Sequence, residues 1–311
     1  MSEFSSNDDN RQKDSFEILL EENYQNLNSD LCKKLVKEYV DEHESLKGEN
    51  IFFIKKLSKV IHNILHTEPS FFRDDLEKLH RYNIEGVEVI RTLDGNEYED
   101  KNLTSIASHF LGYAGEIAYQ IYSKNQVEKW AVLCYENNRI SARLLQHTNA
   151  RYSAYTFGYA GSIAKTLYDE TNDIRWLYRW YHAKLVSAKV AEDVDTKHAS
   201  YCYSIAGKAA MQLFEIKKKN LYGTLWHEHY KKSAELAIGN NDKHAAHAYS
   251  FAGNAAMKLF INTKETQWAV KWFECYVLSG DLSEKQRYCI RIILIVSQVM
   301  QPETITNKLM I

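Results

Sequence analysis

Residues 244–260 read HAAHAYSFAGNAAMKLF, and closely similar stretches occupy residues 198–214 (HASYCYSIAGKAAMQLF) and 152–168 (YSAYTFGYAGSIAKTLY). A weaker copy, IASHFLGYAGEIAYQIY, covers residues 106–122. Every copy contains an Ala-Gly pair, and the glycines recur at a constant interval of 46 residues: Gly115, Gly161, Gly207 and Gly253. A fixed period of this length is typical of a chain built from repeated helical units.

Each unit contains two helical patterns of about 20 residues, of which the first carries the Ala-Gly pair. The second opens with large rings, at Trp130, Trp176, Tyr222 and Trp268 and, one turn later, at Cys134, Trp180, Trp226 and Trp272. A Ser-Ala pair follows in three of the second patterns, beginning at Ser141, Ser187 and Ser233, with Ser279-Gly280 as the last copy. Between the two patterns, Asn125, Thr171 and Thr263 are suited to cap the second helix, with Lys217 in the same register. Turn-forming Asn149, Asp195 and Asn241 precede the next unit.

The repeated glycines indicate close packing between helices. A glycine inside a helix costs about 0.5–1 kcal/mol relative to alanine, so four in register imply a compensating need for space. We expect the stripe of Ala and Gly to receive the large Trp and Tyr residues of adjacent second helices. Small residues facing large ones in every unit predict a stack of helical hairpins.

The units resemble tetratricopeptide-like helical repeats. The segments AGEIA, AGSIA, AGKAA and AGNAA match the first helix of that family, and Ala269, Phe273 and Tyr276 follow the spacing of its second helix. The chain departs from the pattern in its 46-residue period, where the family has about 34, in lacking a proline at the end of each unit, and in Tyr276, where the family prefers Ala. The resemblance covers residues 104–280 and implies a right-handed α-solenoid of antiparallel helical hairpins.

Composition agrees with an all-α protein. Only 2 of 311 residues are proline and 12 are glycine, so long stretches contain no strong helix breaker. The net charge of -2 provides no general attraction to nucleic acid or anionic membranes. Five scattered cysteines without a C-x-x-C pair suggest a reducing compartment, and the first residues lack a signal-peptide pattern, so we expect a cytoplasmic protein without a membrane span.

Four regions are predicted along the chain. Residues 1–14 are expected to be a disordered tail, and 15–102 an N-terminal helical region with helices at 15–28, 30–46, 51–66 and 70–83. Residues 84–100 fit either a helix or a hairpin at Asp94-Gly95, and we favour the helix. Four hairpin repeats follow at 103–282, and a capping helix and tail at 283–311.

If tetratricopeptide geometry holds, the first helices line a concave groove that suits a protein or peptide ligand. The predicted partner-binding residues form three rows, one residue per repeat: His109, Tyr155, Tyr201 and His247; Glu116, Ser162, Lys208 and Asn254; Tyr119, Lys165, Met211 and Met257. Rings supply contact area and the polar groups supply direction. The alternative is that these rings pack between neighbouring repeats. The favoured function is a non-catalytic adaptor or scaffold.

Two other functions stay open at this point. Tyr and His rings on helical repeats also stack on bases, and the lysines at 217–219 add local charge, which keeps RNA or DNA binding as an alternative. An enzyme is the second alternative, although no nucleophile elbow, phosphate-binding loop or H-E-x-x-H motif is present and no cysteine has an evident histidine partner. His227 and His229 diverge on a helix, and His244 and His247 align with tyrosines in other repeats, so neither a metal nor a cofactor is predicted.

Overall fold

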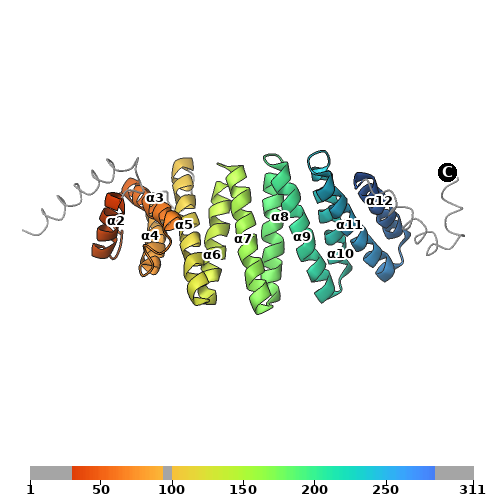
Figure 1. The fold of residues 1–311 in the computed structure, drawn as a ribbon, viewed down its shortest axis with the longest axis horizontal. Coiled ribbons are helices and arrows are strands. Elements are labelled where there is room, and N and C mark those ends of the chain that lie inside the picture. Colours follow the sequence, from red (N-terminus) through yellow and green to blue (C-terminus); the bar gives the residue numbers. More distant parts are fainter. Residues whose placement is uncertain (1–29, 94–99, 284–311) are drawn as a thin grey trace, which may run out of the picture. The chain divides into compact units, whose positions relative to one another are not determined.

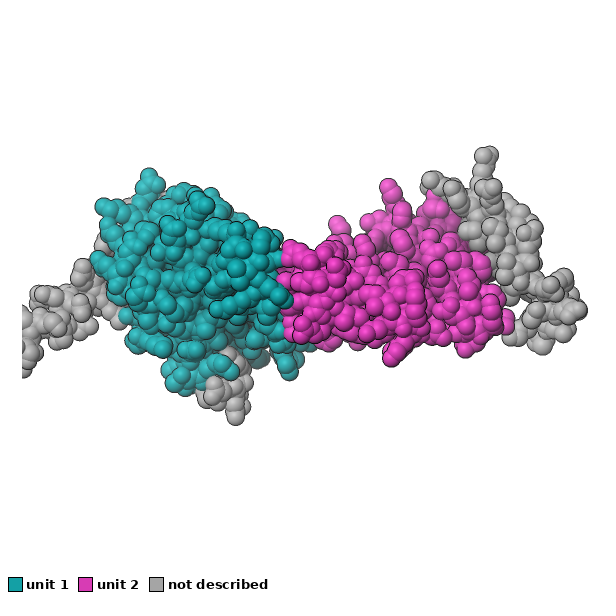
Figure 2. Space-filling model, turned by 90° about the horizontal axis from the view of Figure 1, so that it is seen from below, with its two compact units in different colours: residues 1–148 teal, residues 149–311 magenta. Residues whose placement is uncertain are grey.

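The computed structural model describes residues 30–93 and 100–283, and every regular element in those ranges is an α-helix. The predicted all-α class is therefore confirmed. The chain divides into two compact units, residues 1–148 and 149–311 (Figure 2). The boundary falls between the first and second repeats. The tail predicted at 1–14, the helix at 15–28 and the capping helix from 284 onward lie outside the described residues.

The first unit contains α2 (Asp30–Glu42), α3 (Ile51–Thr67), α4 (Leu76–Leu93), α5 (Lys101–Asn125) and α6 (Glu128–Leu145) (Figure 1). The helix predicted for 70–83 begins only at Leu76, because successive turns closed by hydrogen bonds between residues three apart follow Pro69. It then continues to Leu93, which confirms the helical interpretation of residues 84–93; residues 94–99 are not described. The helix predicted for 30–46 ends at Glu42.

The second unit contains α7 (Ala150–Thr171), α8 (Ile174–Ala191), α9 (Thr196–Lys217), α10 (Asn220–Ala237), α11 (Asp242–Thr263) and α12 (Thr266–Leu282) (Figure 1). Every pair of consecutive helices from α7 to α12 packs together. The second unit is therefore a solenoid-like stack of three hairpins, α7–α8, α9–α10 and α11–α12, and α5–α6 is the equivalent hairpin of the first unit. We call α5, α7, α9 and α11 the first helices and α6, α8, α10 and α12 the second helices.

The turn inside each hairpin corrects the predicted capping residues. Asn125, Thr171, Lys217 and Thr263 are the last residues of the first helices, and the N-caps of the second helices lie two residues later. The intervening residue adopts a left-handed conformation in all four hairpins, with φ between 53° and 60° at Gln126, Asn172, Lys218 and Lys264. Asn125, Thr171 and Thr263 instead accept a hydrogen bond from the N–H two residues ahead, which stabilises the turn.

The turns between hairpins follow the prediction. Asn149, Asp195 and Asn241 are the N-caps of α7, α9 and α11, and each side chain accepts the N–H three residues later. An N-cap of this kind contributes about 0.5–2 kcal/mol to stability.

The repeated serine binds the two helices of a hairpin together. Its hydroxyl donates to a backbone carbonyl of the first helix 33 residues earlier in every hairpin, from Ser141 to Ser108, Ser187 to Ala154, Ser233 to Ser200 and Ser279 to Ala246, at 2.6–2.8 Å. A carbonyl inside a helix already accepts its own helical bond, so the serine uses the second lone pair. This bond requires the helices to approach closely.

The glycine stripe allows that approach, and the residue facing it is of the predicted type in two of the four hairpins. The residue over the glycine lies 23 positions later in each hairpin: Asn138 over Gly115, Lys184 over Gly161, Tyr230 over Gly207 and Tyr276 over Gly253. We call these four the covering residues. The expected Trp residues pack elsewhere: Trp226 shares a core cluster with Ala210, and Trp268 and Trp272 pack with Ala256. The prediction is therefore correct for the alanines of the stripe and for Gly207 and Gly253, which face tyrosines. It is wrong for Gly115 and Gly161, which face Asn138 and Lys184.

The tightness of this contact predicts opposite effects for one substitution at two glycines. A Cβ at Gly207 would come within 2.5 Å of Tyr230 Cδ2, whereas a Cβ at Gly112 meets only Ser141 Oγ at 3.7 Å. We expect Gly207→Ala to lower the free energy of unfolding by about 1–3 kcal/mol through overpacking. Gly112→Ala should raise it by about 0.5–1 kcal/mol, because alanine is the better helix former. Denaturant unfolding of both variants measures the two changes; a stabilised Gly207→Ala would contradict the packing.

The left-handed residue at the end of each first helix generates a second prediction. Lys264 has a φ of 60°, where a side chain is disfavoured, and it is exposed. Lys264→Gly should therefore raise the free energy of unfolding by about 0.5–1 kcal/mol. The matched control is Lys258→Gly, at an exposed position inside α11, which should lower it by about 1 kcal/mol. The prediction fails if both variants lose stability equally.

Candidate partner-binding face of the first helices

The first predicted row lies on the surface. His109, Tyr155, Tyr201 and His247 are all exposed, the two tyrosines by 44% and 55%. These rings are therefore not buried between repeats, although Tyr155 contacts Asp195 and His198 of the next repeat, as the alternative predicts for that ring. His109 Nδ1 bonds to the Ser105 carbonyl of its own helix.

The second row is mostly engaged by the chain itself. Glu116 Oε2 lies 3.1 Å from Nδ1 of His62; burial alone would raise the pKa of Glu116, but its hydrogen bond to His62 and the charges of His62 and His66 lower it. Ser162 accepts a hydrogen bond from Lys184, and Asn254 accepts one from the Tyr276 hydroxyl at 2.7 Å. Only Lys208 stands exposed without such a contact.

The third row divides between surface and core. Tyr119 is exposed, and Lys165 pairs with Asp169 of its own helix. Met211 and Met257 are half-buried and pack against core clusters. These two predicted contact residues thus contribute to packing, because the 3.6-residue period places them at the margin of the buried stripe.

Tyr155 organises a polar cluster at the start of α7 and α9. Its hydroxyl donates to Asp195 Oδ2 at 2.6 Å, and Arg151 donates to the same oxygen at 3.0 Å. Asp195 Oδ1 accepts the backbone N–H of His198, whose ring lies 4.3 Å from the Tyr155 ring. The hydrogen bond from Tyr155 and then the His198 N–H hold the pKa of Asp195 at about 2. The cluster therefore carries a fixed carboxylate.

His198 also contacts Ser187 and Cys202. Cys202 therefore has a histidine partner, which was not evident from the sequence. Ser187 Oγ lies 3.0 Å from His198 Nε2 and 3.2 Å from Cys202 Sγ, and His198 Nε2 lies 3.4 Å from that sulfur. The i, i+4 spacing of His198 and Cys202 on one helix was the available signal.

This group of three does not have the features of a nucleophilic site. The Ser187 proton is directed to the Ala154 carbonyl, so His198 must donate to the serine and cannot act as its base. Cys202 is fully buried, and burial raises the pKa of its thiol. The next hairpin repeats the arrangement with Ser233 and His244 at 3.1 Å, as expected of a structural contact.

Lys184 is a buried cation that the sequence analysis did not identify. Its stem lies over Gly161, and its Nζ donates to the Gly158 carbonyl at 2.5 Å and to Ser162 Oγ at 3.0 Å. Burial lowers its pKa. A lysine in a sequence is normally expected on the surface. Only the tyrosines at the equivalent positions in the next two hairpins would have indicated that Lys184 is buried.

The two histidines of the HEH segment have separate partners, as their divergence on the helix predicts. His227 Nδ1 bonds to the Ala252 carbonyl of α11 at 3.0 Å. His229 Nε2 bonds to the Tyr181 hydroxyl of α8 at 2.9 Å, and burial lowers the pKa of His229 to about 4. Both are neutral packing residues at neutral pH.

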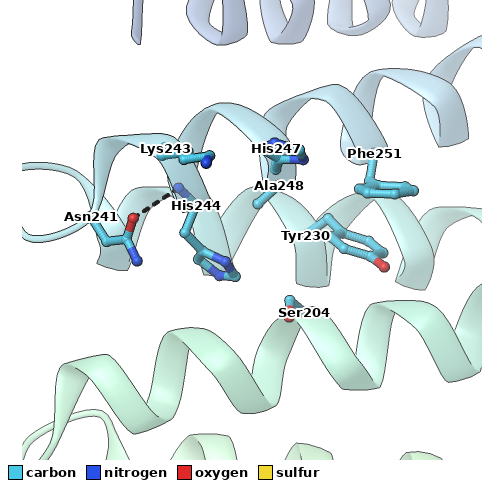
Figure 3. Close-up of a pocket in the computed structure, with 8 residues that line it drawn as sticks. All are labelled: Ser204, Tyr230, Asn241, Lys243, His244, His247, Ala248 and Phe251. Carbon is cyan, nitrogen blue, oxygen red and sulfur yellow. Dashed lines mark hydrogen bonds between the residues drawn. The ribbon is translucent and has the colours of Figure 1, made fainter. Parts of the chain in front are cut away.

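A shallow depression of about 360 Å³ opens on the first-helix face of the second unit. Figure 3 shows its lining: Ser204 from α9, Tyr230 from α10, Asn241 at the start of α11, and Lys243, His244, His247, Ala248 and Phe251 from α11. Tyr230 and Phe251 stack with ring centroids 5.0 Å apart. The lining contains no carboxylate. The lining thus includes His247 of the first predicted row and the covering residue Tyr230.

Within residues 30–93 and 100–283, no three His, Cys, Asp or Glu side chains are grouped so as to hold a metal ion. No helix in those ranges is long and apolar enough to cross a membrane.

Comparisons with known proteins find distant structural likenesses only. No family model and no curated protein matches the chain. Among solved structures, it is similar to a circular tandem repeat protein with novel repeat topology and enhanced subunit contact surfaces, at 14% identity and a TM-score of 0.34, over 91% of this chain and 68% of the other. It is also similar to a protein described as the DHF58 filament, at 12% identity and a TM-score of 0.24, over 78% and 96% of the two chains. Likenesses this distant carry no functional argument.

The depressed pKa of Asp195 predicts how its contribution depends on pH. Because the folded pKa of about 2 lies below the usual value near 3.9, the stabilisation is fully present above pH 5 and is lost as the pH falls towards 2. Asp195→Asn keeps an N-cap of the type found at Asn149 and Asn241 but removes the charge. We expect this variant to melt below the parent at pH 7, with the difference vanishing near pH 2.

Asp193→Asn is the control, because it makes the same charge change at an exposed neighbour. Melting curves from pH 2 to 7 for both variants measure the effect. Equal pH dependence of the two variants would contradict the assigned Asp195 contacts.

Proposed function

We propose that this protein is a non-catalytic adaptor that binds a protein or peptide segment along the first-helix face of its second unit. The observation that carries the proposal is a group of exposed aromatic rings on successive first helices: Tyr152, Tyr155 and Tyr159 on α7, Tyr201 on α9 and Phe251 on α11. The second helices of this unit carry fewer exposed rings, Tyr178 and Phe273. A concentration of exposed rings exceeds what folding requires and is common in protein interfaces. The tetratricopeptide-like repeat pattern supports the same use of the first helices.

The surroundings of these rings favour a polypeptide ligand. Beside Phe251, the depression is lined by an amide, a hydroxyl and two imidazoles, those of Asn241, Ser204, His244 and His247. Such groups pair with the backbone and side chains of a peptide. The cluster of His198 and Cys202 lacks an accessible nucleophile, which weakens the alternative of an enzyme.

Nucleic-acid binding is the less favoured alternative. The three lysines at 217–219 lie at the turn between α9 and α10, whereas Tyr201 is near the start of α9. Arg151 is already paired with Asp195. Near the rings, Lys197 and Lys243 are left without an ion pair to a described residue. Two lysines neutralise few phosphates, and backbone phosphate contacts dominate affinity in nucleic-acid complexes.

Tyr201 provides the cleanest test, because its ring is 55% exposed and its hydroxyl makes no hydrogen bond within the described part of the chain. Peptides selected from a displayed random library on the purified protein should bind Tyr201→Ala roughly tenfold or more weakly, because interface energy concentrates in a few aromatic anchors. The melting temperature should stay unchanged.

Tyr178→Ala is the matched control. This ring is 36% exposed but lies on a second helix, α8, and its loss should leave peptide affinity unchanged. Undiminished peptide affinity in folded Tyr201→Ala would refute the first-helix face as the binding surface. Displacement of the peptides by oligonucleotides, with a steep loss of binding in salt, would instead support the nucleic-acid alternative.

A further inference from the structure

One of the four covering residues, Tyr230, has a polar group that makes no hydrogen bond within the described residues. Asn138 donates to the Cys134 carbonyl, Lys184 donates to the Gly158 carbonyl and Ser162, and the Tyr276 hydroxyl donates to Asn254. The Tyr230 hydroxyl alone among the four makes no hydrogen bond to a described residue. The reason lies in the register: the acceptor supplied by Ser162 and Asn254 is replaced by Lys208 in the Tyr230 hairpin.

This hydroxyl belongs to a side chain that lines the depression of Figure 3. Tyr230 is only 6% exposed, and its ring is held between Gly207 and Phe251. Burial raises its pKa to about 12, so the hydroxyl stays protonated and can donate. The hydroxyl oxygen is not one of the fully buried polar atoms of the described residues, so a ligand that carries an acceptor can reach it.

The preceding hairpin shows which acceptor fits the neighbouring groups. There, Tyr155 and Arg151 of α7 hold the carboxylate of Asp195, the N-cap of α9. The equivalents one repeat later are Tyr201, Lys197 and Asn241. Because Asn241 has no charge, the chain supplies no carboxylate at this second position.

The lysine equivalent to Arg151, Lys197, and the lysine that lines the depression, Lys243, are correspondingly unneutralised. Neither Lys197 nor Lys243 forms an ion pair with a residue in the described ranges. The nearest acid along the chain, Asp242, accepts the Gly239 N–H at 2.8 Å. Lys243, His247 and Tyr230 all line the depression.

We propose that the depression between α9 and α11 binds the carboxylate of an acidic side chain of the bound peptide. The Tyr230 hydroxyl and the Lys243 ammonium donate to it, and Phe251 packs against its aliphatic stem. This inference rests on the proposed function and specifies the chemistry of the ligand. Charge-assisted hydrogen bonds of this kind are stronger than neutral ones.

The test uses the full-length chain and a small probe, so it needs no identified partner. N-acetyl-glutamate methylamide is titrated while the imidazole resonances of His244 and His247 are followed by NMR, with the glutamine counterpart as neutral control. Glutamate should shift these resonances and glutamine should not. Tyr230→Phe should weaken glutamate binding about tenfold, and Lys243→Gln should weaken it and reduce its dependence on salt.

Melting temperatures show whether the Tyr230 hydroxyl serves the fold instead. Tyr230→Phe should leave the melting temperature unchanged, whereas Tyr276→Phe, which loses the bond to Asn254, should lower it by a few degrees. Equal losses in the two variants would overturn the inference, as would equal binding of glutamate and glutamine or tighter binding of inorganic phosphate.

The two proposals fail separately. Peptides that bind the parent and lose affinity in Tyr201→Ala, yet tolerate Glu→Gln at every acidic position, would overturn the carboxylate site and leave the adaptor function standing. Glutamate binding that depends on Tyr230 supports the carboxylate site whatever the result at Tyr201.

Discussion

The close approach of the two helices in each hairpin is the constraint on which the rest of the structure depends. A serine on the second helix reaches a backbone carbonyl of the first at 2.6–2.8 Å, and a glycine lies beneath the covering residue of the same hairpin. A larger residue at either place would separate the helices. The 46-residue period preserves these two contacts in every copy, while most other positions vary.

The covering residues show how one position serves different purposes within a fixed frame. Asn, Lys and Tyr all span the glycine with their non-polar atoms, so packing alone does not select among them. The covering residues differ in the hydrogen-bond partner of the polar group at the end of the side chain, here called the tip. Lys184 and Tyr276 use theirs within the hairpin, whereas the Tyr230 tip borders a depression. Variation of the tip thus changes the surface without changing the fold.

The sequence was sufficient to predict the all-α class, the hairpins and the turns at Asn149, Asp195 and Asn241, because periodicity and capping are local properties. It misplaced the caps of the second helices by two residues, since Thr171 and Thr263 stabilise turns as well as helix ends. It also expected a Trp or Tyr over every glycine, whereas Asn138 and Lys184 cover Gly115 and Gly161. Contacts between helices depend on rotation about the helix axis, and repeat alignment alone does not supply that angle.

Part of the candidate site was predictable from the sequence, because the helical period determines which side chains are exposed. Exposure of Tyr155 and Tyr201 follows from their place opposite the buried stripe, which the period determines. Tyr155 donates a hydrogen bond to Asp195, whereas Tyr201 has no such partner among the described residues. This difference depends on side chains 40 residues apart in the sequence. Only the assembled stack shows that two nearly identical repeats differ in whether the chain supplies its own carboxylate. Small differences between equivalent positions, rather than the shared motif, therefore provide the evidence about ligands in this protein.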